Sequence, residues 1–493
     1  MGSSPNGITE TLLRLPQRGF FIFTALLILK GDCILQVAQQ PSDNTTGISP
    51  MKTTVLFLLL LAFSIECNAQ ARPKKILIKN IMVFNGIDNR IFKSDILIDG
   101  PMIVKVDPVI TLDTINDVTI IDGTGTFAMP GMIDAHSHLL LEALPVSSLY
   151  TADISYMSLL AAHFAERQLM RGFTTVRDMG GNTFALAKAI DGGLVKGPRV
   201  YPSGAAISQT GGHGDFDLPT STQANGELSY LSQNGMTAIA DGYDEVLKQA
   251  RIQLRQGATQ IKVCVGGGII SMYDPIDVSQ FTEREISAAV QAAENWGTYV
   301  TVHAYNNVSV RRALGAGVKC IEHAQLIDDS TARLMAEKNV WWSLQPFLND
   351  NDVTPYPEGS SNWKKQQEVI KGTDNAYRMA KKYNIKVAFG TDHLFDSSTV
   401  DNQGHILTKL STWYSPYEIL KMATSDNAAL LRMCGERNPY QLGPIGEISA
   451  GSYADLIVLD GNPLDDLRLI EQPKEHFKVI IKNGIIYKNE LSK

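Results

Sequence analysis

The chain has 493 residues, of which 44% are hydrophobic and 19% are charged, and its formal net charge at pH 7 is −7. This composition is that of an ordinary globular protein, and the length predicts a large enzyme domain with additions, or two to three domains. The acidic excess argues against nucleic-acid binding as the main activity, because a surface that binds phosphates needs a basic excess.

Residues 51–69 are typical of a secretory signal peptide. They begin with Met51-Lys52, continue with a short apolar run and end with small residues up to Ala69. A basic start, an apolar core and a small-residue cleavage point characterise such signals, and the apolar run is too short to span a bilayer. We therefore expect a periplasmic or secreted protein with no stable membrane span after cleavage. Residues 1–50 are interpreted as a non-native upstream extension of a chain that starts at Met51.

Strand-rich segments occur at both ends of the remaining chain, over residues 75–128 and 440–493. Asp-Gly and similar turn dipeptides separate their strands. Each segment is too small to bury a core alone, because a few short strands need partners. We expect the two segments to pair and to form one small, composite, β-sandwich-like domain.

Residues 129–439 alternate apolar strands with helical segments, which predicts a parallel sheet and the α/β fold class. Eight parallel strands with intervening helices close most simply into a (β/α)8 TIM barrel. The eight predicted strands are residues 127–136, 173–178, 199–207, 260–265, 299–303, 319–323, 340–344 and 387–392. Three long connections follow strands and are expected to form substrate walls at the catalytic face: residues 208–241, 346–362 and 393–413.

Side chains that can bind a metal stand at the ends of several predicted strands. His136 and His138 are two residues apart, so they point to the same face of a strand. His303, His323 and Asp392 end three further strands. A single histidine at a strand end is more often structural, but four of the nine histidines of the chain occupy such positions. This pattern predicts a metal site at one end of the barrel.

Lys262 lies within the predicted strand 260–265. A lysine that faces a barrel interior is costly unless it is paired or chemically modified. Carbamylation by CO2 would turn it into an anion that can bridge two cations. The other interpretation is that Lys262 faces outward and reaches solvent along its aliphatic stem, and its position in the strand leaves both open.

Other residues near the predicted strands have structural interpretations. Arg177 and Asp178 are expected to form an ion pair that closes the barrel. The cysteines beyond the signal segment are expected to be buried thiols, because their spacing indicates neither a metal site nor a disulfide framework. They are Cys264, Cys320 and Cys434.

The pattern as a whole resembles the amidohydrolase superfamily over nearly all of residues 75–490. The resemblance is carried by the run from Gly131 to His138 and by Lys262, His303, His323 and Asp392. The segments Gly172–Asp178 and Ser208–Gly214 are similar to the imidazolonepropionase-related branch. That branch includes zinc-dependent Xaa-Pro and Xaa-Arg dipeptidases and bacterial ochratoxin-hydrolysing amidohydrolases.

The resemblance implies a binuclear metal-dependent hydrolase that cleaves an amide or peptide bond of a dipeptide or an N-acyl amino acid, and we expect a homo-oligomer. Two divalent ions, expected to be Zn²⁺, would be held by His136, His138 and Asp392 (inner ion) and by His303 and His323 (outer ion), with carbamylated Lys262 as the bridge. The ions would activate a shared water, and Asp392 would pass its proton to the leaving amine.

Two further residues are candidate catalytic residues beside Asp392. Tyr305 lies two residues after His303, so it points the same way if the strand continues; the related dipeptidases have a substrate-contacting tyrosine in this arrangement, and a position at the core rim is the alternative. His213 lies in the glycine-rich loop 211–214, from which it could reach the substrate carbonyl or remain in solvent. His393 is expected to point away from the site, because it follows Asp392 on the same predicted strand.

Two other functions remain open. A lactonase or a phosphotriesterase could use the same binuclear site on a different bond. A non-catalytic binding module is the third hypothesis, and the complete set of predicted metal ligands argues against it.

Overall fold

The computed structural model describes residues 23–29, 32–38, 75–113, 117–220, 228–271, 273–350, 352–353 and 355–491. The chain divides into two units, Met1–Arg72 and Pro73–Lys493. In the first unit the described residues form one antiparallel pair, β1 (Phe23–Leu29) and β2 (Asp32–Ala38). The predicted signal peptide at residues 51–69 lies outside the described residues.

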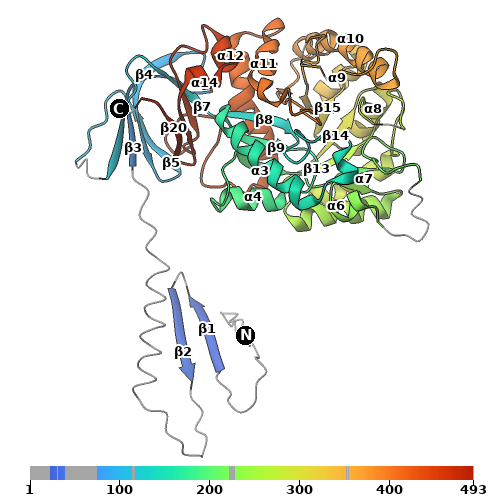
Figure 1. Ribbon diagram of the computed structural model, residues 1–493, viewed down its shortest axis with the longest axis horizontal. Coiled ribbons are helices and arrows are strands. Elements are labelled where there is room, and N and C mark those ends of the chain that lie inside the picture. Colours follow the sequence, from blue (N-terminus) through green and yellow to red (C-terminus); the bar gives the residue numbers. More distant parts are fainter. Residues whose placement is uncertain are drawn as a thin grey trace, which may run out of the picture. The chain divides into compact units, whose positions relative to one another are not determined.

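The two ends of the second unit meet in one eight-stranded sheet (Figure 1). The strand order is β20-β19-β18-β7-β3-β4-β5, with β6 beside β3. The strands are β3 (Lys75–Phe84), β4 (Ile91–Asp99), β5 (Met102–Asp107), β6 (Val118–Asp122), β7 (Phe127–Pro130), β18 (Leu456–Leu459), β19 (Phe477–Lys482) and β20 (Ile485–Asn489). Because β18 pairs antiparallel with both β7 and β19, the expected pairing of the two chain ends is confirmed. Side chains of both ends, such as Ile78 and Val458, fill one core.

The strands of the central region are parallel and form two hydrogen-bonded groups. They are β8 (Met132–Ser137), β9 (Phe173–Asp178) and β10 (Arg199–Pro202) in the first, and β11 (Ala206–Ser208), β12 (Thr237–Ile239), β13 (Ile261–Cys264), β14 (Val300–Ala304), β15 (Cys320–His323), β16 (Trp341–Ser343) and β17 (Val387–Ala388) in the second. β10 and β11 are two parts of one predicted strand. β8, at the edge of the first group, meets the segment that follows β17, at the edge of the second group. There Ala135 N donates to Phe389 O (2.9 Å) and Asp392 N donates to His136 O (2.8 Å). Each of the eight predicted strands has a counterpart, and the α/β prediction is confirmed.

Helices connect the parallel strands and lie outside them (Figure 1). The α-helices are α2 (Ser148–Thr151), α3 (Ile154–Met170), α4 (Phe184–Asp191), α5 (Tyr230–Gln233), α6 (Tyr243–Gln256), α7 (Glu283–Asn295), α8 (Asn307–Ala316), α9 (Asp329–Glu337), α10 (Ser361–Lys382), α11 (Gln403–Thr408), α12 (Pro416–Lys421), α13 (Asn427–Leu431) and α14 (Pro473–His476). α7 illustrates why they form: Thr282 and Glu285 make a capping box, and Ile286, Ala289 and Ala293 give it one buried face. Among the described residues, no helix has the length and apolar character needed to cross a bilayer.

The first predicted strand, residues 127–136, is divided in the structure. β7 belongs to the composite sheet and β8 to the barrel strands, with Gly131 between them. Gly131 N donates to Asp455 O (2.9 Å), and a Cβ at Gly131 would lie 2.2 Å from Thr174 Oγ1. The chain therefore passes from one sheet to the other at a point that is too crowded for any side chain.

An ion pair between Arg199 and Asp455 joins the barrel strands to the composite sheet. Arg199 Nε lies 2.8 Å from Asp455 Oδ2, and both side chains are almost fully buried. Arg199 also donates to Asn483 Oδ1 (2.8 Å), and its guanidinium lies 4.8 and 4.0 Å from the ring centres of Tyr440 and Tyr453. The charge is thus balanced, and both Nε and Nη2 have acceptors, so the pair can hold elements that are 256 residues apart.

Replacing Asp455 by alanine would leave the Arg199 charge buried without its partner. Breaking a buried ion pair typically costs about 3–5 kcal/mol, so we expect Asp455→Ala to lower the free energy of unfolding, measured by urea denaturation, by that amount. Glu337→Ala is the control, because Glu337 pairs with Arg333 at the surface and its side chain is 61% exposed; exposed pairs contribute little. Equal effects of the two substitutions would contradict this assignment.

Candidate metal centre

A cavity of about 180 Å³ lies at the carboxyl ends of the barrel strands. The eight residues predicted for the site all line it: His136, His138, His213, Lys262, His303, Tyr305, His323 and Asp392. The three long connections expected to form substrate walls also contribute, for example through Phe216, Phe347 and Phe395. The structure therefore brings together side chains that are far apart in the sequence.

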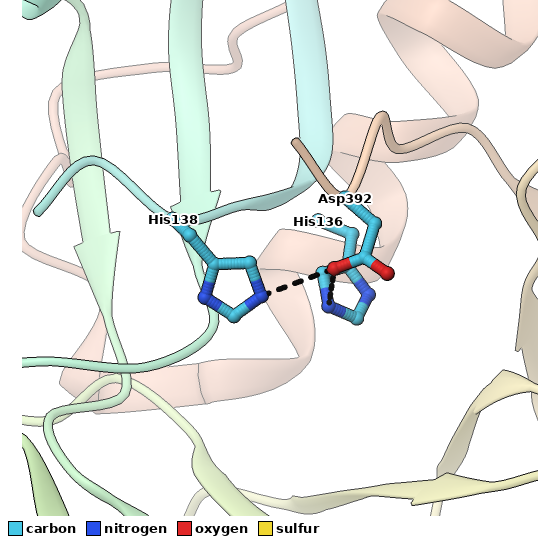
Figure 2. Close-up of side chains that lie close together, drawn as sticks. All are labelled: His136, His138 and Asp392. Carbon is cyan, nitrogen blue, oxygen red and sulfur yellow. Dashed lines mark ion pairs between the residues drawn. The ribbon is translucent and has the colours of Figure 1, made fainter. Parts of the chain in front are cut away.

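His136, His138 and Asp392 form the tightest group in the cavity. Figure 2 shows the Asp392 carboxylate facing both imidazole rings, and the two Nε2 atoms each lie 3.2 Å from Asp392 Oδ1. Their ligand atoms all lie within 4.8 Å of one another. Two imidazole nitrogens and one carboxylate oxygen are the donor types that zinc binds in proteins, so the group can hold a metal ion.

Burial and neighbouring charges together set the protonation of this group. It lowers the pKa of His136 to about 4, with a further contribution from the charge of Lys262. Burial alone would raise the pKa of Asp392, but the neighbouring histidines, His136 foremost, hold that pKa well below its usual range. At neutral pH, His136 is thus neutral and Asp392 is ionised. His136 Nε2 is buried with no hydrogen-bond partner, which fits a nitrogen whose lone pair binds a cation.

His303 and His323 form a second pair of candidate ligands, with ring centres 4.6 Å apart. His303 Nε2 donates to Gly267 O (3.1 Å), which leaves Nδ1 for a metal. His323 Nδ1 donates to Gln345 Oε1 (2.7 Å), which leaves Nε2. Burial lowers the pKa of His323 to about 3 and that of His303 well below its usual value. Both rings are therefore neutral, as metal binding requires.

The backbone turns sharply where β15 and β17 end. The φ angle is +73° at His323, +58° at Ala324 and +54° at Asp392. Residues with side chains rarely adopt such angles, and these conformations are concentrated at functional sites. In a regular strand, Glu322 and His323 would point to opposite faces. Because the backbone turns at His323, Glu322 points into the barrel and His323 still reaches the cavity.

Lys262 faces the cavity from β13, so the interpretation that it points outward is wrong. Lys262 is buried, with 4% of its surface exposed. Its charge is one of the causes that lower the pKa of His136, His303 and His323. An ammonium group among these nitrogen donors repels any metal ion that they bind, unless its charge is removed.

His213 and Tyr305 lie against the histidines of the second pair. The His213 ring stacks on the His303 ring, with centres 3.8 Å apart, and its Nδ1 lies 3.1 Å from Ser271 Oγ. Tyr305 is buried, and its ring stacks on His323 with centres 5.1 Å apart. The interpretation of His213 as a solvent-exposed loop residue is therefore wrong, and Tyr305 lies at the cavity and not only at the core rim.

Two predictions about neighbouring residues are wrong. Arg177 does not pair with Asp178: its Nη2 donates to Glu322 Oε1 (2.7 Å), whereas Asp178 accepts from Leu139 N and the Thr183 hydroxyl, both at 2.9 Å. His393 lines the cavity instead of pointing away. The strand β17 ends at Ala388, so strand alternation does not govern the residue after Asp392.

Glu322 and Tyr356 are neighbours of the centre that the sequence patterns did not indicate. Glu322 Oε2 accepts from His136 Nδ1 at 2.8 Å. Although burial alone would raise the pKa of Glu322, Arg177 and His136 hold it well below its usual value. Tyr356 lines the cavity, and burial, with the charge of Asp392, raises its pKa to about 12. The sequence held one signal for Glu322, a charged glutamate within an apolar strand. Nothing in the connection 346–362 distinguished Tyr356 from its neighbours.

The comparisons with known proteins agree with this geometry. The Amidohydrolase family model matches residues 127–488. The ochratoxinase of Aspergillus niger is 32% identical over 369 residues, which cover 70% of this chain and 72% of that protein. A solved prolidase complexed with N-methylphosphonate-L-proline is 30% identical with a TM-score of 0.76, and a Xaa-Pro dipeptidase with bound methionine is 29% identical with a TM-score of 0.70; each match covers 84% of this chain and 100% of the other. As the sequence motifs predicted, the chain belongs to the amidohydrolase family.

Proposed function

We propose that this amidohydrolase cleaves the amide or peptide bond of a small substrate, a dipeptide or an N-acyl amino acid, at a centre of two zinc ions. One observation carries the proposal: four histidines, Lys262 and Asp392, which lie on five different barrel strands or just after them, converge on one cavity. The similarity to a prolidase and a Xaa-Pro dipeptidase, both named for peptide-bond cleavage, favours this function over a lactonase or phosphotriesterase at the same centre.

In this proposal His136, His138 and Asp392 would hold the inner cation and His303 and His323 would hold the outer one, and carbamylated Lys262 would supply a further carboxylate ligand. Carbamylation would remove a buried positive charge and provide a carboxylate that both cations can share. When bound, the cations lower the pKa of a water molecule and polarise the scissile carbonyl.

Asp392 is placed to move the proton. Its carboxylate faces the cavity and lies 3.2 Å from the Nε2 atoms of both inner histidines. It accepts a proton from the attacking water and donates it to the amine nitrogen as the carbon–nitrogen bond breaks. His213 Nδ1 lies 3.1 Å from Ser271 Oγ, so Nε2 is the nitrogen left for the substrate. When the Ser271 hydroxyl donates to Nδ1, the ring proton is on Nε2, and His213 can donate it in a hydrogen bond to the substrate carbonyl oxygen. The Tyr305 ring, stacked on His323, forms the adjoining wall.

The walls beyond the centre favour an apolar group next to the scissile bond. Side chains such as Phe216, Ile270 and Phe347 line the cavity. Lys409 also lines it, but Lys409 Nζ lies 2.7 Å from Asp350 and 2.6 Å from Asp352, so its charge is already balanced. An acyl or side-chain group with apolar surface would gain most from this lining.

Metal analysis tests the binuclear centre. We expect two zinc ions per chain in protein reconstituted with bicarbonate, and a crystal structure of that protein should show Lys262 carbamylated. Removal of the ions by a chelator should abolish hydrolysis, and re-addition of zinc with bicarbonate should restore it. One ion per chain beside an unmodified Lys262 would contradict the proposal.

The proton transfer predicts the effect of Asp392→Asn. Asparagine keeps the size of the side chain but cannot accept the proton, and general acid–base groups contribute roughly 10²–10⁴-fold in rate. We expect kcat to fall by at least that range while the fold and one metal ion remain. Asp396→Asn, which changes a partly exposed aspartate outside the cavity lining, is the control. Near-full activity of Asp392→Asn with both metals bound would rule out this role.

A substrate screen tests the reaction class. We expect the zinc-loaded protein to hydrolyse N-acyl amino acids or dipeptides, with a higher kcat/KM for apolar groups than for matched charged ones, and to be far slower on lactones and aryl phosphotriesters. A preference for the esters would support the alternative function. Full metal loading without turnover of any amide in the library would favour a binding module.

A further inference from the structure

Glu322 lies beneath the candidate metal centre, inside the barrel. It precedes His323 on β15 and is in register with His303 of β14. Its side chain is fully buried, and Oε2 lies 2.8 Å from His136 Nδ1. The carboxylate thus contacts one of the inner ligands from the side opposite the cavity.

The second oxygen of Glu322 is held by three donors. Oε1 accepts from Arg177 Nη2 (2.7 Å), from the Thr301 hydroxyl and from the Cys320 thiol (3.3 Å). Arg177 is fixed in turn, because its Nε donates to Ala135 O at 2.6 Å. With both oxygens engaged, Glu322 cannot turn away from His136 without breaking several buried hydrogen bonds.

This contact determines which nitrogen of His136 is available. Nδ1 donates to the carboxylate, so the lone pair that remains is on Nε2, the atom 3.2 Å from Asp392 Oδ1. The other histidines differ: His303 donates to a backbone carbonyl and His323 to the amide oxygen of Gln345. Among these three rings, His136 alone donates a hydrogen bond to a carboxylate, which makes its free nitrogen the more basic metal ligand.

We propose that Glu322 is a positioning residue for metal binding: it fixes His136 as an Nε2 ligand and supplies the negative charge that strengthens binding at the inner site relative to the outer one. The inference rests on the proposed function for the presence of the ions. It assigns Glu322 no contact with substrate.

The experiment compares zinc affinities of the reconstituted proteins by chelator competition. Loss of a carboxylate that supports a metal-bound histidine typically weakens metal binding about 10–100-fold. We expect Glu322→Gln to weaken one of the two sites by that factor and to leave the other unchanged. The control is Glu142→Gln, because Glu142 is the only other buried glutamate in the described part of the chain. We expect Glu142→Gln to bind zinc as the wild type does.

A double variant separates this role from a purely structural ion pair. Glu322→Gln leaves the buried charge of Arg177 without its partner. The double variant Glu322→Gln with Arg177→Met removes both charges of the pair. If Glu322 acts on His136, the double variant stays weakened at the same site. Zinc affinity restored in the double variant, or unchanged in Glu322→Gln, would overturn the proposal.

A measurement on the unmutated protein covers the case in which these variants do not fold. Nitrogen-15 NMR of the zinc-loaded protein should show His136 protonated at Nδ1 and metal-bound at Nε2. Metal ligation through Nδ1 would overturn the proposal. A wild-type protein that binds no zinc at all would instead refute the proposed function, so the two failures are distinguishable.

Discussion

The centre depends on one kind of interaction: in each of three histidine rings, one nitrogen donates a hydrogen bond to a fixed acceptor. Glu322, Gly267 O and Gln345 accept from His136, His303 and His323, and each bond leaves the other ring nitrogen toward the cavity. Burial keeps the rings neutral, so their lone pairs are available at physiological pH. A cation that binds there meets preformed donors, and little side-chain freedom remains to be lost.

The barrel seam holds these rings in place. Asp134 accepts from His136 N at 3.0 Å and from the Thr391 hydroxyl at 2.6 Å, so one buried carboxylate ties His136 of β8 to the residue before Asp392. Asn427 closes the same seam, since its amide donates to Ile133 O (2.7 Å) and to Phe389 O (2.8 Å). Strand ends that no longer pair regularly are thus held by side chains, which permits the unusual backbone angle at Asp392.

The composite sheet serves the centre indirectly. β7 leads through Gly131 straight into β8, the strand that carries His136 and ends one residue before His138. The Arg199–Asp455 pair joins the C-terminal strands to β10. Neither chain end could bury its strands alone, so the first barrel strand is anchored only when both ends of the chain are in place. This dependence explains how segments so distant in sequence come to support one site.

Much of this protein could be predicted from the sequence, because the signals were local. Alternation of apolar strands with helices indicated the α/β fold, the paired ends followed from short strands without a core, and ligands at strand ends pointed to one end of a barrel, where they now line one cavity. Contacts across the barrel depended on the tertiary structure. Arg177 and Glu322 form a hydrogen bond although they are 145 residues apart in the sequence, and Glu322 and His136 do so although they are 186 residues apart. Strand alternation predicted that His393 points away from Asp392, and it would equally place Glu322 and His323 on opposite faces. In both places a residue with a positive φ angle interrupts the alternation. Periodicity describes a regular strand, and it carries no information where the backbone leaves the strand or about which buried charge lies beside another.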